Sequence, residues 1–213
     1  MKQLPRLMMA VAALALLALF SLPLWRITLI APQYPHGVTM YIWINKLGGD
    51  EPAVLQNINI LNHYVGMQYI EPDSIPELTY FPYIVVGLVI LGLMSAIINR
   101  KGLFLGWAIL LVVLAGIGIY DFYLWEYDYG HNLSPDAPIK VPGAVYQPPV
   151  IGSKTILNFI AQSYPHTGGL VAGLSILLAF AAWFFKRKQD NHETSALVGV
   201  RADRPRRVLH TVA

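Results

Sequence analysis

The sequence predicts an all-α membrane protein with four transmembrane helices and two ordered loops that together form a cap. Only 13% of the 213 residues are charged, whereas about 25% is usual in soluble domains. Each of four uncharged apolar runs is about as long as a helix needs to cross a hydrocarbon core of roughly 30 Å. These runs are Leu7–Trp25, Pro82–Ile98, Gly102–Tyr120 and Thr167–Phe185. Because a chain in lipid must satisfy its own backbone hydrogen bonds, we expect all four to be helical.

The first helix is expected within residues 1–25, a helical hairpin over 82–125 and the fourth helix over 167–186. Basic residues before the first run resemble the start of a signal peptide. The apolar run is longer than usual for such a peptide, and no clean cleavage site follows it. We therefore interpret it as an uncleaved span, with cleavage left open as an alternative.

The distribution of Lys and Arg predicts that both termini face the cytoplasm. If the N-terminus is inside, 11 of the 15 basic residues lie on the cytoplasmic side, and this bias sets topology. The chain is then a multi-pass protein of the bacterial inner (cytoplasmic) membrane, with periplasmic loops at 26–81 and 126–166. Residues 187–213 are basic and are expected to form a disordered cytoplasmic tail.

Both loops carry signals of local structure. Residues 38–47 are rich in β-branched and aromatic side chains, which predicts a strand of about nine residues. Residues 55–67 have the apolar periodicity of an amphipathic helix in the membrane interface. The prolines of 130–149 preclude a long helix, so an extended segment lying over the first loop is expected there. Residues 154–163 are predicted to form a short interfacial helix.

A candidate copper site lies on the predicted helix of the first loop. His63 and Met67 are four residues apart, which places an imidazole and a thioether on one helical face. These ligands suit a soft ion such as Cu(I), and Met40 or His36 of the preceding segment is the expected third ligand. The alternative is a metal-free helix in which Met67 packs against apolar groups and His63 bonds a carbonyl of the second loop. If copper binds, Asn59 and Asn62 beside it are expected to orient the His63 imidazole through hydrogen bonds.

Other chemistry is disfavoured. The chain has no cysteine, which excludes disulfides, thiolate metal sites and covalently attached haem. The acids Asp121, Glu126 and Asp128 are interpreted as a solvated rim at the end of the third span rather than a proton pathway, because the other spans carry no ionisable group. Neither a catalytic triad nor a phosphate-binding loop is present, so we expect no enzymatic activity.

Three stretches resemble a small family: residues 31–37, Ile58–Met67 and Tyr129–Gly143. They are similar to the polytopic accessory proteins (NosB-like) encoded beside nitrous-oxide reductase in clade II nos gene clusters. The resemblance covers about residues 20–185. It implies an accessory role for a periplasmic copper enzyme in nitrous oxide reduction and denitrification, and it assigns no catalytic residue.

The function we expect is therefore that of a non-enzymatic membrane accessory protein supporting a periplasmic copper redox enzyme, through assembly, copper handling or electron delivery. Its expected partners are membrane lipid and a periplasmic or membrane redox protein. Nucleic acid is not expected, because the basic residues flank helices or lie in the tail. The alternative is a structural membrane-anchor subunit of a respiratory complex that binds no metal. A small-molecule permease is disfavoured by the lack of polar groups in the spans.

Overall fold

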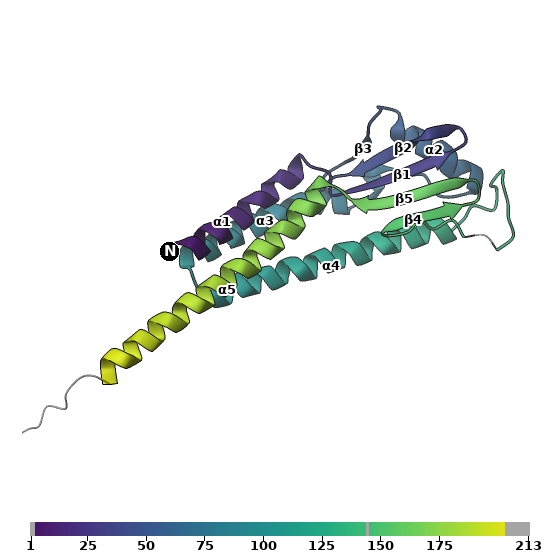
Figure 1. Ribbon diagram of the computed structural model, residues 1–213. Helices are drawn as coiled ribbons and strands as arrows, with labels where there is room; N and C mark the ends of the chain where they lie inside the picture. The colour runs from purple at the N-terminus through teal and green to yellow at the C-terminus, as the bar shows by residue number, and fades with distance from the viewer. Residues whose placement is uncertain (1–2, 144, 203–213) are drawn as a thin grey trace, which may run out of the picture.

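A computed structural model describes residues 3–143 and 145–202, which form a helical bundle with a β-sheet at one end (Figure 1). The bundle contains α1 (Leu4–Ala15) with its 3-10 continuation η1 (Leu16–Phe20), α3 (Glu77–Ile98), α4 (Lys101–His131) and α5 (Thr167–Ala202). Arg6 donates hydrogen bonds to the carbonyls of Ala96 and Ile97, at 3.2 and 3.3 Å. The first turn of α1 therefore lies beside the C-terminal end of α3, away from the sheet.

The prediction of an all-α fold is wrong, because the two predicted loops together build a five-stranded antiparallel sheet. Its strands are β1 (Trp25–Ala31), β2 (Tyr34–Ile42), β3 (Leu47–Gly49), β4 (Gly152–Ile156) and β5 (Phe159–Pro165). Their order is β3-β2-β1-β5-β4, so β1 and β5 join the two loops. Since β1 follows the first helix and β5 precedes α5, pairing them satisfies the backbone where the chain leaves the bundle.

Two local predictions meet different outcomes in this sheet. The strand expected over 38–47 is present as β2, although it begins at Tyr34 and ends at Ile42. The helix expected over 154–163 is wrong, because these residues form the β4–β5 hairpin. Ala161 and Ser163 alternate with exposed or half-buried neighbours and are fully buried. This two-residue period belongs to a strand with one covered face.

The prediction of four transmembrane helices is also wrong. In the described ranges, three helices are long and apolar enough to cross a membrane: Glu77–Ile98, Lys101–His131 and Thr167–Ser195 of α5. The first apolar segment has only 12 residues of α-helix and 5 of 3-10 helix. Residues 21–25 do not continue the helix, because the chain turns at Ser21, bends at Leu22 and Leu24, and enters β1 at Trp25. The composition of the three long helices indicates a membrane protein.

The short first helix still packs within the bundle. Its Met9, Ala12 and Ala13 are fully buried in a core shared with α3, α4 and α5. From α4, Trp107 is also buried there and donates its indole N–H to the Leu88 carbonyl at 2.9 Å. Small residues on α1 therefore let neighbouring helices approach, as is usual in lipid.

Glycine allows this close packing at one place in the bundle. A Cβ on Gly92 would lie 2.6 Å from the Cβ of Ala13 and 3.0 Å from the Trp107 ring, whereas one on Gly87 would meet nothing within 4 Å. Gly106, Gly116 and Gly118 of α4 also have open space around them. Of these five glycines, Gly92 alone lies where a Cβ would clash with a neighbouring helix.

Gly92→Leu is expected to destabilise the bundle by about 1 to 3 kcal/mol, because the added side chain overpacks the contact with α1. Gly87→Leu, in the same helix, is the matched control and should leave stability almost unchanged. Thermal unfolding of both variants in detergent, followed by circular dichroism, measures the difference. Equal unfolding midpoints for the two variants would contradict this packing.

The sheet carries a second core, in a unit that we call the head domain: residues 25–75, 122–143 and 145–165. One face of the sheet is covered by α2 (Val54–Val65). Val38, Met40, Ile58 and Val65 are among the residues buried between them, and Phe122 of α4 packs against the same core. The C-terminal part of α4, from Phe122 onward, therefore belongs to the head domain as well as to the bundle.

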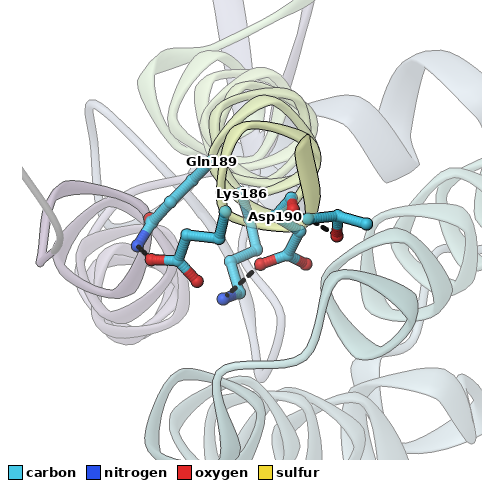
Figure 2. A network of polar contacts seen from close by, with 5 residues as sticks. Lys186, Gln189 and Asp190 are labelled. Atoms are coloured by element: carbon cyan, nitrogen blue, oxygen red, sulfur yellow. Dashed lines mark hydrogen bonds and ion pairs between the residues drawn. The ribbon is translucent and has the colours of Figure 1, made fainter. Parts of the chain in front are cut away.

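Helix α5 continues to Ala202, so residues 187–202 of the tail that was expected to be disordered are helical. Figure 2 shows polar pairs one turn apart on it: Lys186 Nζ lies 2.7 Å from Asp190 Oδ1, and Gln189 contacts Glu193 at 3.5 Å. Such i,i+4 pairs stabilise exposed helices. Residues 203–213 of the predicted tail lie outside the described residues.

Candidate functional site

The candidate site is built at the C-terminal end of α2. The helix buries Ile58 and Val65 of its predicted apolar stripe in the head core, together with Val54, which precedes the predicted range. It ends at Gly66, whose φ of +80° is left-handed, a conformation that glycine adopts without strain. The Met67 N–H then bonds back to the Asn62 carbonyl at 2.9 Å. Met67 therefore lies beyond the helix, and the predicted spacing of one helical turn from His63 does not apply.

His63 is exposed and is oriented by an aromatic neighbour. Its Nδ1 lies 3.3 Å from the hydroxyl of Tyr69, and the two rings are stacked with centroids 6.2 Å apart. The predicted alternative was a bond from His63 to a carbonyl of the second loop; among the described residues, the His63 ring instead meets the Tyr69 hydroxyl. Because Tyr69 engages Nδ1, the other ring nitrogen is the one left for a ligand.

Two depressions meet at His63. The first, which we call the His63 pocket, has a volume of about 410 Å³ and lies between the end of α2 and residues 132–137. Met67, Gln68 and Asp136 line it together with His63 and Tyr69. The second is a shallower hollow of about 730 Å³ along α2, lined on its polar side by Gln56, Asn59, His63 and Glu71. The His63 pocket thus brings an imidazole, a thioether and a carboxylate to one opening.

The other two predicted ligands lie elsewhere. Met40 is 4% exposed and is part of the head core, whereas His36 is exposed near the start of β2. Neither lines the His63 pocket or the neighbouring hollow. In the ranges that the structure describes, no three His, Asp or Glu side chains gather as a metal site would require. Of the four predicted metal ligands, the pocket brings together His63 and Met67.

The two asparagines expected to orient the imidazole instead form hydrogen bonds with the backbone of residues 68 and 70. The Asn59 side chain makes two hydrogen bonds to the backbone of Ile70, at 2.7 and 3.1 Å. Asn62 is buried and donates to the Gln68 carbonyl at 3.2 Å. Both fold residues 67–70 back onto α2, and this return places Met67 and Tyr69 beside His63.

The outer wall of the His63 pocket comes from the second predicted loop. The Ser134 N–H donates to the Gly66 carbonyl at 2.7 Å, and the Ile139 N–H donates to the Tyr64 carbonyl at 2.9 Å. A Cβ at Gly66 would lie 2.8 Å from that of Ala137, so only glycine fits this contact. Two backbone hydrogen bonds and one close approach therefore fix the wall to the end of α2.

Glu126 lies in an environment that differs from the predicted solvated rim. It is 5% exposed, and among the described residues neither of its buried carboxylate oxygens has a hydrogen-bond partner. Phe122, one turn earlier, packs on Trp25 at the start of β1 with ring centroids 5.6 Å apart. Glu126 therefore lies level with the sheet, beyond the membrane-spanning part of α4. Burial raises its pKa to about 8.

The sequence contained a signal for this burial. Phe122, Glu126 and Gly130 are spaced by four residues, which places them on one face of α4. Tyr146 covers that face: its N–H bonds the Gly130 carbonyl at 3.0 Å, and its ring is 2% exposed. By contrast, Asp128 is exposed and accepts a hydrogen bond from Gln68, as a rim residue should.

No family model, curated protein or solved structure matches the chain.

Proposed function

We propose that the chain is an accessory protein of the bacterial inner membrane whose head domain handles copper for a periplasmic redox enzyme. In this proposal it catalyses no reaction itself. The observation that carries the proposal is that His63 and Met67, from opposite sides of the Gly66 turn, line one solvent-open pocket. The long apolar helices would hold this pocket at a fixed height above the membrane.

The ligand set suits transfer of copper better than storage. Cu(I) accepts soft imidazole and thioether ligands, and the Nδ1–Tyr69 contact leaves His63 Nε2 to bind the ion. Met40, the expected third ligand, is buried in the head core. A third ligand would then come from the partner that receives the ion. The resemblance of residues 31–37, 58–67 and 129–143 to proteins of nos gene clusters makes nitrous-oxide reductase the proposed partner.

Copper binding is tested by Cu(I) titration of the detergent-purified chain against a chromophoric chelator. We expect about one copper per chain, and His63→Ala and Met67→Leu should each weaken binding at least about tenfold. His166→Ala and Met94→Leu remove the same groups outside the pocket and should bind like the wild type. Copper binding that is unchanged in both pocket variants would contradict the proposal.

The alternative function is a structural anchor whose head domain docks a redox partner and binds no metal. One observation favours it: Met67 also packs against the head core, as a purely structural methionine would. In that case the purified chain takes up no copper in the same titration. A periplasmic partner would still co-purify with the His63→Ala variant.

A further inference from the structure

A row of polar and aromatic side chains crosses the uncovered face of the sheet. Arg26 of β1 lies opposite Tyr41 of β2 and opposite Tyr164 of β5. Residues directly opposite each other in antiparallel strands project from the same face. The Arg26 guanidinium lies 5.9 Å from the centre of the Tyr164 ring, in cation–π contact.

Three further side chains extend this row. Trp43 packs edge-on against Tyr41 with ring centroids 5.8 Å apart, and Lys46 Nζ lies 4.8 Å from the centre of the Trp43 ring. On the other side, the His166 ring is 5.1 Å from that of Tyr41. We call this set the basal cluster: Arg26, Tyr41, Trp43, Lys46, Tyr164 and His166.

The basal cluster lies where the head domain meets the bundle. The Trp43 indole N–H donates to the carbonyl of Ser21, the residue after η1, at 3.2 Å. The His166 N–H donates to the Leu24 carbonyl at 2.9 Å, and His166 immediately precedes α5, a candidate span that starts at Thr167. The basal cluster is therefore level with the end of a membrane-spanning helix, where lipid headgroups lie.

The cations of the basal cluster are available to an anion. Arg26 and Lys46 are both exposed. Among the residues that the structure describes, neither forms an ion pair with a carboxylate, in contrast to Lys186. Burial raises the pKa of Tyr41, and so does a hydrogen bond with the Asp50 carboxylate, which already engages the phenol O–H. The donors left for an anion are therefore the guanidinium of Arg26 and the ammonium of Lys46, and phosphate groups accept hydrogen bonds from both.

We propose that the basal cluster binds the phosphate of an anionic phospholipid in the leaflet that faces the head domain. Two observations favour a lipid over an acidic protein segment. The cluster lies at the depth of the headgroups, and its tyrosine and tryptophan rings are the side chains that settle in this layer. The bound lipid would fix the tilt of the sheet relative to the membrane. This proposal is independent of copper binding.

The test is a lipid titration of the full-length chain in detergent, read by native mass spectrometry. Phosphatidylglycerol and phosphatidylcholine are the probes. The wild type is expected to bind the anionic lipid at least about tenfold more tightly than the zwitterionic one. The double variant Arg26→Gln/Lys46→Gln should lose that preference, and Arg26→Lys/Lys46→Arg, which keeps both charges, should restore most of it.

A matched control separates this site from general charge attraction. Lys140→Gln/Lys154→Gln removes two positive charges from exposed positions outside the basal cluster and should keep the preference of the wild type. Equal losses in the two double variants would overturn the proposal, as would full binding by Arg26→Gln/Lys46→Gln. Displacement of the lipid by millimolar inorganic phosphate would also overturn it, because the cluster would then be a site for free phosphate.

Discussion

Glu126→Met is expected to stabilise the protein most strongly at alkaline pH. Both oxygens of the Glu126 carboxylate are buried, and no other residue in the part of the chain that the structure describes forms a hydrogen bond with them. Burying a carboxylate without a hydrogen bond lowers the free energy of unfolding. A methionine side chain has a similar length, so it removes this destabilisation without opening a cavity. The gain should be smallest at acidic pH, where the carboxyl group is neutral, and largest once it ionises.

The direction of the pH dependence follows from the raised pKa of Glu126. In the folded protein this pKa is about 8, compared with an ordinary value of 4.5. Between these two values the unfolded chain has lost the proton while the folded chain still holds it. The free energy of unfolding therefore falls as the pH rises from about 4.5 to about 8, and this contribution then levels off. The full difference corresponds to roughly 3 to 5 kcal/mol.

Thermal unfolding in detergent between pH 5 and pH 9 measures this effect. The wild type should lose stability with rising pH relative to Glu126→Met, and the gap between the two midpoints should widen up to about pH 8. Asp128→Asn removes an exposed acid two residues away and should keep the slope of the wild type. A constant difference between wild type and Glu126→Met at every pH would show that the carboxyl group does not titrate in this range.

Gly130→Val is expected to detach the segment around Tyr146 from α4. A Cβ at Gly130 would overlap the backbone N and Cα of Gln147, which cannot move as a flexible side chain can. The clash would break the hydrogen bond from Tyr146 to the Gly130 carbonyl and expose a ring that is now 2% exposed. Loss of this packing should cost about 2 to 4 kcal/mol.

Two measurements distinguish this detachment from a general loss of folding. The unfolding midpoint should fall, and trypsin should cut faster at Lys154, whose Nζ now donates to the Gln147 carbonyl at 2.9 Å. Gly106→Ala, in the same helix but in open space, should change neither quantity. Wild-type cleavage rates in Gly130→Val would mean that the segment does not depend on this close approach.

Local sequence was sufficient where a property depends on neighbours along the chain. The apolar runs over 82–98, 102–120 and 167–185 lie within α3, α4 and α5. The sequence predicts them because the free energy of transferring a segment from water to lipid is a sum over that segment's own residues. The apolar period of residues 55–67 similarly predicted a helix, which is present as α2 from Val54 to Val65 and buries Ile58 and Val65 of the predicted stripe. Residues 130–149 were expected to lie over the first loop, and their contacts with Tyr64 and Gly66 are present.

Local sequence failed where a property depends on distant segments. Strand β1 begins inside the residues assigned to the first span, and it pairs with its neighbour β2 on one side and with the sequence-distant β5 on the other. Residues 154–163 have enough apolar side chains for either a helix or a strand, and the sheet decides between them. Glu126 is buried on a face of α4 against which Tyr146 and Gln147 pack one turn later, at Gly130.

The candidate site combines both kinds of information. The sequence by itself determined which side chains could bind a soft metal ion, since His63 and Met67 lie four residues apart in the predicted helix. Helical spacing predicted that the two side chains lie one turn apart on a single helix. In the structure the helix ends between them, at the left-handed Gly66. Tertiary structure alone decided that they share a pocket, because the hydrogen bonds from Asn59 and Asn62 fold the chain back after the turn. Residues 132–137, which are distant in sequence, supply the opposite wall.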